Sequence, residues 1–155
     1  MPVQPIPAGY RTLTPYFSVR GAAAAIDFYK EAFGATEIDR FAMPDGAIAH
    51  AELEIGDSKF MLADENKEWG NLGPETLGGT SVVMMLYVAD VDAAFARAVG
   101  AGAAVKMEVQ NHFYGDRSGT VTDPFGHQWM ISTHVEDVDP AEMATRVAGM
   151  AVAAV

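Results

Sequence analysis

The stretch Lys-Phe-Met-Leu-Ala at residues 59–63 is followed, 69 positions later, by Gln-Trp-Met-Ile-Ser at residues 128–132, and this pairing decides the fold. Each stretch carries three large apolar side chains at its centre. The same offset places Ile26 on Phe95, in two segments whose apolar residues are spaced as in amphipathic helices. An offset that aligns a strand-like stretch and a helix-like segment together predicts two copies of one supersecondary unit.

The composition is that of a folded globular protein, with 155 residues of which 50% are hydrophobic and 20% are charged. This length suits one domain in which two half-size units share a core. The formal net charge of -11 opposes binding to nucleic acids and to anionic membranes. The chain has no cysteine, which excludes disulfides, thiolate nucleophiles and sulfur-rich zinc sites.

The first ten residues contain three prolines and no basic, apolar signal segment. No apolar stretch is long enough to span a bilayer. We therefore expect a cytoplasmic protein with neither a membrane nor a nucleic acid as its partner.

The first unit is predicted to span residues 9–64 with the order βαβββ. Its helix, Gly21–Phe33, has one apolar stripe and ends before Gly34. Gly56-Asp57 is typical of a tight hairpin between the last two strands. The predicted strands are residues 13–19, 38–41, 48–55 and 59–63.

The second unit, residues 80–134, repeats this order. Its helix, residues 91–99, is capped by Asp90 and followed by Gly102, and Asp123–Gly126 fits a type I turn. Because His127 follows that turn, we expect it at the surface. The predicted strands are residues 82–88, 104–108, 119–122 and 128–133.

A glycine-rich linker, residues 65–79, joins the two units. Together they are expected to form one domain over residues 1–137, followed by a helical extension over residues 138–155.

The predicted fold is α+β, with one helix covering one face of each small sheet. Placed side by side, the two units would form a long curved mixed sheet whose uncovered face surrounds a cavity. Strand alternation decides which residues line that cavity. The residues predicted to point into it are Thr14, Tyr16, Ser18, His50, Glu52, Lys59, Met61, Val83, Met85, Tyr87, Gln128, Met130 and Ser132.

Several stretches resemble the vicinal oxygen chelate superfamily, which includes glyoxalase I, bleomycin resistance proteins and extradiol dioxygenases, and within it the PhnB-like branch. They are residues 14–19 (Thr-Pro-Tyr-Phe-Ser-Val), 50–57 (His-Ala-Glu-Leu-Glu-Ile-Gly-Asp), 114–119 (Tyr-Gly-Asp-Arg-Ser-Gly) and 123–129 (Asp-Pro-Phe-Gly-His-Gln-Trp). The resemblance extends from Gly9 to about Asp137 and implies two βαβββ units around a cavity, paired in a homodimer.

Metal-dependent members of that superfamily hold His, Gln or Glu at four equivalent positions in the first and last strands of each unit. The resemblance aligns those positions with Thr14, Met61, Val83 and Met130. None of the four is a normal ligand for a divalent cation. We therefore expect neither a metal nor another cofactor at the usual site.

His50 and Glu52 are the candidate catalytic residues, because a spacing of two places both side chains on one face of a strand. They form an acid–base pair, a displaced metal site, or only a hydrogen bond at the mouth of the cavity. The Arg117 guanidinium either clamps an anionic ligand group or holds its loop through a salt bridge.

The remaining candidates form an adaptable apolar surface of methionine and aromatic residues. Met61, Met85 and Met130 with Tyr16 and Tyr87 make up this surface, and Trp69 and Tyr114 are added to it as ligand-binding candidates. The leading hypothesis is a metal-independent binding protein for a small organic ligand, antibiotic-like or aromatic, as in bleomycin resistance proteins. The alternatives are a lyase, isomerase or dioxygenase with a shifted site at His50 and Glu52, and an interaction module with a filled pocket.

Overall fold

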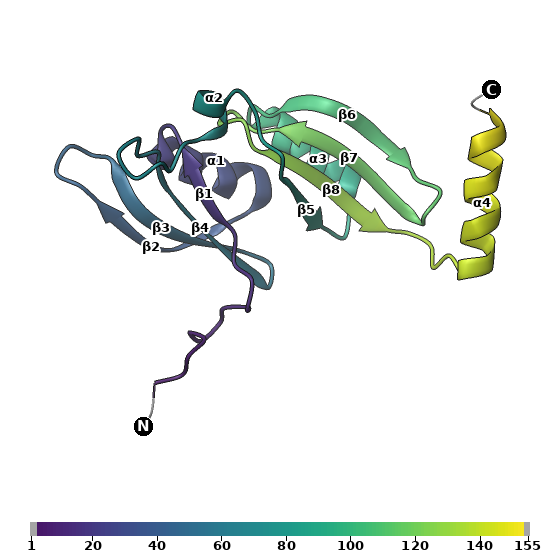
Figure 1. Cartoon of the computed structure of the whole chain (residues 1–155), viewed down its shortest axis with the longest axis horizontal. Helices are drawn as coiled ribbons and strands as arrows, with labels where there is room; N and C mark the ends of the chain where they lie inside the picture. The colour runs from purple at the N-terminus through teal and green to yellow at the C-terminus, as the bar shows by residue number, and fades with distance from the viewer. Residues whose placement is uncertain (1–2, 154–155) are drawn as a thin grey trace.

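The computed structural model describes residues 3–153 and contains both predicted units (Figure 1). The outermost residues of the expected domain and extension, 1–2 and 154–155, lie outside the described part. The first unit consists of β1 (Tyr16–Val19), α1 (Ala22–Phe33), β2 (Thr36–Ala42), β3 (Ile48–Ile55) and β4 (Ser58–Asp64). The second consists of β5 (Val83–Tyr87), α3 (Val91–Gly100), β6 (Ala104–Asn111), β7 (Asp116–Thr122) and β8 (Gln128–His134). The predicted α+β fold with a doubled βαβββ order is confirmed.

Two further helices lie outside the repeats. The short helix α2 (Pro74–Leu77) interrupts the linker, where only a loop was expected, and α4 (Pro140–Ala153) follows the second unit as predicted. Of the part of the chain that the structure describes, no helix is both long and apolar enough to cross a membrane.

The strands form two mixed four-stranded sheets, with the orders β1-β4-β3-β2 and β5-β8-β7-β6. In each sheet the first strand runs parallel to the last, and the other neighbours are antiparallel. One long sheet was expected, but β1 and β5 are both edge strands and are not hydrogen-bonded to each other. The two units are therefore joined by side-chain packing instead of by a continuous ladder.

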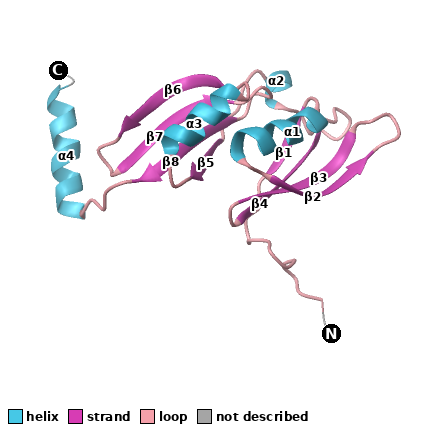
Figure 2. Ribbon diagram, turned by 180° about the vertical axis from the view of Figure 1, so that it is seen from behind, coloured by secondary structure: helices cyan, strands magenta, loops and turns pink. Residues whose placement is uncertain are grey.

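Helices α1 and α3 lie on the same side of the two sheets and pack against each other (Figures 1 and 2). Between them and the sheets lies one shared aromatic core that includes Tyr29, Phe60 and Trp129, all at most 5% exposed. The Tyr29 hydroxyl and the Trp129 indole both donate to the Asp123 carboxylate, at 2.8 and 3.0 Å. Because Tyr29 belongs to the first unit and Asp123 to the second, the hydrogen bond between them links the two units.

The helix ends follow from local chemistry and from one contact across the chain. Gly34 ends α1 in the left-handed region, at φ 68°, and the Asp90 carboxylate caps α3 by accepting from the Ala93 amide at 3.0 Å. The start of α1 lacks a local cap. Instead the Asp64 carboxylate, at the end of β4, accepts from the amides of Gly21 and Ala22, both at 2.9 Å.

His127 is half-buried, so the expectation of a surface position is wrong. Its ring stacks on Phe17 of β1 with centroids 4.4 Å apart and an interplanar angle of 21°. Sequence spacing placed it after a turn, but that turn packs against the first unit instead of projecting into solvent.

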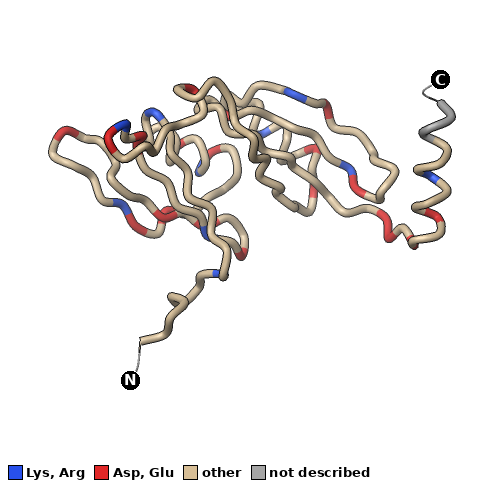
Figure 3. The backbone as a smooth tube through the Cα atoms, viewed as in Figure 1, with Lys and Arg blue, Asp and Glu red and all other residues tan. Residues whose placement is uncertain are grey.

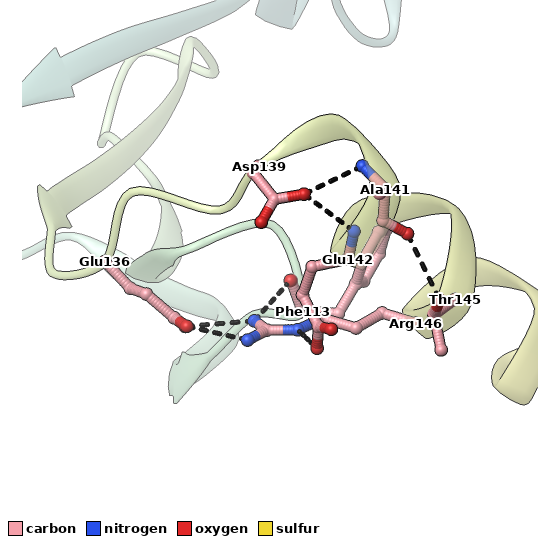
Figure 4. Close-up of polar contacts among 7 residues, drawn as sticks. All are labelled: Phe113, Glu136, Asp139, Ala141, Glu142, Thr145 and Arg146. Atoms are coloured by element: carbon pink, nitrogen blue, oxygen red, sulfur yellow. Dashed lines mark hydrogen bonds and ion pairs between the residues drawn. The ribbon is translucent and has the colours of Figure 1, made fainter.

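Helix α4 stands away from the two sheets and is held by a small polar cluster at its start (Figures 1 and 4). Arg146 donates to both carboxylate oxygens of Glu136, at 2.9 and 2.6 Å, and to the Phe113 carbonyl at 3.0 Å. Asp139 caps the helix by accepting from the amides of Ala141 and Glu142, at 2.9 and 3.0 Å. Acidic residues occur in both units and before α4 and do not gather in one patch (Figure 3).

Candidate functional site

The candidate site lies on the sheet faces that no helix covers. Since α1 and α3 lie on the same side, the opposite faces of both sheets are open (Figure 2). On the first face the strand register puts Tyr16, Met61 and Glu52 in one row across β1, β4 and β3. On the second face, Met85, Met130 and Thr120 form the corresponding row across β5, β8 and β7.

A polar chain of three side chains occupies the first uncovered face. The Tyr16 hydroxyl lies 2.9 Å from His50 Nδ1, and His50 Nε2 lies 3.4 Å from Glu52 Oε1. This arrangement fits an imidazole protonated on Nε2, which accepts from the tyrosine and donates to the carboxylate. The structure thus brings the two candidate catalytic residues together and adds Tyr16 to them.

Tyr10, in the segment before β1, adjoins this chain. Its hydroxyl is buried beside the Glu52 carboxylate, outside regular hydrogen-bond geometry. Burial, reinforced by the Glu52 carboxylate, raises the pKa of Tyr10 to about 12. The interaction with Tyr10, with a further contribution from His50, lowers the pKa of Glu52. Glu52 is therefore an anion at neutral pH, in contact with His50 and next to the Tyr10 hydroxyl.

A second polar cluster occupies the uncovered face of the other sheet and is centred on Asp116, which is 4% exposed. Its carboxylate accepts from the Tyr87 hydroxyl at 2.8 Å and from the Ser132 hydroxyl at 3.2 Å, and it pairs with His134 Nδ1 at 2.7 Å. His134 Nε2 also contacts the Asp137 carboxylate at 3.0 Å.

The electrostatics of this cluster follow from the hydrogen bonds. Burial would raise the pKa of Asp116, but the hydrogen bonds from His134, Tyr87 and Ser132 outweigh it and lower that pKa. The hydrogen bond to Asp116, with a smaller one to Asp137, raises the pKa of His134. The Asp116 contact also raises the pKa of Tyr87. Asp116 is thus a buried carboxylate with a partly charged histidine at its side near neutral pH.

Sequence reasoning placed Tyr87 and Ser132 on this face but missed Asp116 and His134. Asp116 was considered only together with Arg117, but adjacent strand residues point to opposite faces. The alternation of β7 would have placed Asp116 on the uncovered face, had the strand not been predicted to begin only at Gly119. His134 follows the predicted last strand and was not among the expected site residues.

Two hydroxyl groups lie beneath this face without partners. Ser118 and Thr120 of β7 are 1% and 4% exposed, and neither side-chain oxygen has a hydrogen-bond partner among the described residues. Thr120 is paired with Met107 and Met130 on the neighbouring strands. Flexible methionines therefore flank a buried polar floor.

The other predicted residues lie apart from these clusters. Arg117 points toward α3, where its guanidinium binds both oxygens of Asp92, at 2.8 and 2.7 Å. Trp69 is 77% exposed in the linker, and the Tyr114 ring stacks on His112 with centroids 5.0 Å apart. The Thr14 hydroxyl donates to the Arg11 carbonyl at 3.3 Å. Val83 and Gln128 face each other at the start of β5 and β8.

The superfamily's four metal positions do not fit a divalent cation in this chain. Thr14 offers one hydroxyl, which is already hydrogen-bonded, Met61 and Met130 offer thioethers, and Val83 offers no donor. Within residues 3–153, no three His, Asp or Glu side chains are grouped in a way that could hold a metal ion. We derive no reaction step through a metal here.

The structure also contains a groove that the strand pattern did not predict. It has a volume of about 580 Å³, lies at the junction of the two units beside β5, and shares Lys59, Met85 and Tyr87 with the predicted lining. The two uncovered faces remain open surfaces in the single chain.

Comparison with known proteins fits this architecture. The sequence profile of the Glyoxalase/Bleomycin resistance protein/Dioxygenase superfamily matches residues 14–131, which span both βαβββ units. The chain belongs to this superfamily. The predicted resemblance is confirmed.

Relatives cover most of the chain. An uncharacterized protein of Mycobacterium tuberculosis is 43% identical over 134 residues, which is 84% of this chain and 79% of that protein. The crystal structure of a gene product from Arabidopsis thaliana has a TM-score of 0.64 and 30% identity and covers 79% of this chain and 98% of its own. A PhnB protein from Bacillus cereus shares the fold, with a TM-score of 0.62 and 16% identity, and the match covers 79% of this chain and 99% of that one.

Proposed function

We propose that this protein binds a small organic ligand on its uncovered sheet faces, without the metal that other members of the superfamily use, and so sequesters or carries it. The main support for this proposal is that Thr14, Met61, Val83 and Met130 stand at the four positions that the resemblance aligns with metal ligands, on a complete superfamily fold. A protein with these residues keeps the surface on which relatives hold their substrates but lacks the donors for a Lewis acid.

The side chains of these faces indicate the kind of ligand. Tyr16, Met85 and Tyr87 are 52%, 45% and 59% exposed, so large apolar groups are available to a flat or aromatic molecule. Each face also carries a carboxylate, Glu52 or Asp116, whose pKa is lowered by its neighbours. We therefore favour a basic aromatic ligand, whose cationic group is attracted to these anions and to the net charge of -11.

The proposal includes a homodimer in the cytoplasm. The uncovered faces carry exposed apolar side chains in the single chain, and a second copy placed against them would enclose the ligand. Light scattering coupled to size-exclusion chromatography tests the dimer, and cell fractionation tests the location. A monomer at all concentrations would contradict the dimer.

The binding proposal is tested with proflavine, a planar aromatic cation, by fluorescence polarisation. Met130→Lys places a positive charge on the uncovered face and is expected to weaken binding by at least about tenfold. Met43→Lys, at an exposed position between β2 and β3, is the matched control and should bind like the wild type. Equal affinities of the two variants would contradict the proposed surface. Retention of one metal per chain, together with turnover of a dicarbonyl or catechol, would contradict a metal-independent binder.

A second candidate function is acid–base catalysis by His50 and Glu52. The observation that favours it is the continuous contact from Tyr16 through His50 to Glu52, at 2.9 and 3.4 Å, since a histidine held between a hydroxyl and a carboxylate is a suitable proton carrier. His50→Ala separates the two functions. A binder loses at most part of its affinity, whereas an enzyme loses turnover and retains binding.

A further inference from the structure

The two units differ at one turn, and the difference opens a groove. In the first unit the pair Ile55–Ser58 encloses two residues, Gly56 and Asp57. In the second unit the corresponding pair is Asp123–His127, closed by the hydrogen bond from the Asp123 amide to the His127 carbonyl at 2.8 Å, and it encloses three residues. The internal symmetry of the fold is therefore broken at this point.

The longer turn brings two rings into the core. Phe125 is 8% exposed and packs near Phe28 and Tyr29, with centroids 6.1 and 6.3 Å apart. The His127 ring stacks on Phe17 of β1 at 4.4 Å. Because the His127 ring covers this part of β1, Phe17 is only 5% exposed, and Val19 on the same face of β1 is fully buried.

The shorter turn has nothing comparable. Ser58 stands in place of His127, and no residue of the first unit corresponds to Phe125. On β5, Leu86 takes the place of Phe17, and its side chain is only partly buried. Among the described elements, no helix packs on β5 as α1 packs on β1. The space that His127 fills in the other half of the molecule is thus empty beside Leu86.

This space is the groove of about 580 Å³ at the junction of the units, which is within the range of small-ligand pockets. Its walls include Leu86 and Val88 on one side and the turn Gly56–Ser58 on the other, and its floor includes Phe60 and Trp129. A planar ring inserted between the turn and β5 would lie where the imidazole lies in the second unit. The shape and lining of the groove therefore favour a flat aromatic group.

The rim of the groove selects the charge of the ligand. It carries two cations, Arg11 and Lys59, and one carboxylate, Asp57. Arg11 pairs with Asp57 at 3.2 Å, and both side chains are largely exposed, so this ion pair is easily exchanged for another partner. Lys59 Nζ lies 4.8 Å from the centroid of the Tyr10 ring, and within residues 3–153 it forms no salt bridge. Lys59 contributes to lowering the pKa of Glu52, but without a salt bridge its ammonium group is also available to an anion at the rim.

We propose that the junction groove is a second ligand site, which binds a planar aromatic carboxylate with its ring between the Gly56–Ser58 turn and Leu86 and its carboxylate at Arg11 and Lys59. The groove adjoins the uncovered face of the second sheet, with which it shares Met85 and Tyr87, and its preference for an anion is opposite to the preference proposed there.

The test uses 2-naphthoate as the probe, with isothermal titration calorimetry and the fluorescence of Trp129. Trp69→Phe leaves Trp129, in the floor of the groove, as the single tryptophan, because the chain has two. Wild-type protein is expected to bind one 2-naphthoate per chain and to bind 2-naphthylmethylamine at least about tenfold more weakly. Arg11→Gln should weaken the binding of 2-naphthoate by about tenfold and leave the affinity for the neutral 2-naphthalenemethanol unchanged.

Ser58→His tests the location, since it restores the ring that the second unit has. The new ring is expected to fill the groove and to weaken the binding of 2-naphthoate by at least about tenfold. Ser58 is exposed, so the variant should fold, and Ser58→Tyr provides a second ring if it does not. Ser81→His, at an exposed position outside the groove, is the matched control. Met130→Lys should leave this affinity unchanged, so the two proposed sites fail or succeed separately.

Three results would overturn the proposal. They are no binding of 2-naphthoate at millimolar concentration, unchanged affinity in both Ser58 variants, and equal affinity for 2-naphthylmethylamine. If 2-naphthoate fails to bind while Ser58→His converts a dimer to a monomer in light scattering, a second copy of the chain occupies the groove and the ligand site is wrong.

Discussion

Replacing Asp116 by alanine is expected to destabilise the protein, because three donors lose one acceptor. The Tyr87 and His134 side chains are exposed enough to turn to water once the carboxylate is gone. The Ser132 hydroxyl is 0% exposed and has no such alternative. A buried donor without a partner costs about 1–3 kcal/mol, and each net hydrogen bond lost adds about 1 kcal/mol. The expected loss in the free energy of unfolding is therefore about 2–4 kcal/mol.

The loss should depend on pH through His134. The pKa of His134 is raised in the folded protein, first by Asp116, so its contribution is fully present below the unfolded pKa of about 6.5 and is lost as the pH rises through the folded value. The pKa of Asp116 is lowered, so its own contribution is present at all pH values above about 4. The difference between the wild type and Asp116→Ala should thus be larger near about pH 5.5 than near about pH 8.5.

Urea unfolding followed by Trp129 emission in a Trp69→Phe background measures both effects. Asp116→Ala combined with Ser132→Ala should recover part of the loss, because no buried donor then remains. Asp137→Ala, which removes only the exposed partner of His134, should change stability by less than about 1 kcal/mol. A loss below about 0.5 kcal/mol at both pH values would refute the buried cluster, and an equal loss at both would refute the pairing of Asp116 with His134.

Further predictions concern the core, the helix ends and the polar chain. Gly119→Ala should destabilise by about 1–3 kcal/mol in chemical denaturation, because a Cβ at Gly119 would lie 2.7 Å from Phe95 Cε2; an unchanged midpoint would show that α3 moves away freely. Tyr29→Phe leaves the ring in place and removes the 2.8 Å hydrogen bond to Asp123, so a loss of about 1–2 kcal/mol is expected in a thermal melt, with Phe28→Leu as a packing control. Asp90→Ala should lower stability by about 1 kcal/mol and reduce amide protection at Ala93 in hydrogen exchange, and unaltered protection would argue against the cap. Tyr16→Phe should change the NMR chemical shifts of the His50 ring, whereas Tyr87→Phe should leave them unchanged, because only Tyr16 lies 2.9 Å from His50 Nδ1.

The uncovered faces and the junction groove illustrate different ways in which a repeated unit gains a site. On the faces, corresponding positions carry different residues, so that the first unit has the chain Tyr16–His50–Glu52 and the second has the cluster around Asp116. At the junction, one residue fewer in a turn leaves a space beside Leu86. Divergence between the copies thus gives each unit its own polar cluster and leaves a groove at their junction.

The sequence by itself determined the doubled βαβββ order, because that order depends on periodicities that are local. The apolar spacing of residues 22–33, the Asp90 cap and the Gly56-Asp57 hairpin each act within a few neighbouring residues, and the structure agrees at all three places. The pair His50–Glu52 was found for the same reason, since a spacing of two on a strand guarantees a shared face.

Only the tertiary structure decided which faces meet and which side chains they bring together. Asp116 and His134 are 18 residues apart on the neighbouring strands β7 and β8, and the start of β7 was predicted too late, so that no local pattern joined them. His127 was expected at the surface but stacks on Phe17, 110 positions earlier in the chain. Contacts over such distances depend on how two units pack through a shared core, and packing is a property of volume and shape that the spacing of residues does not encode.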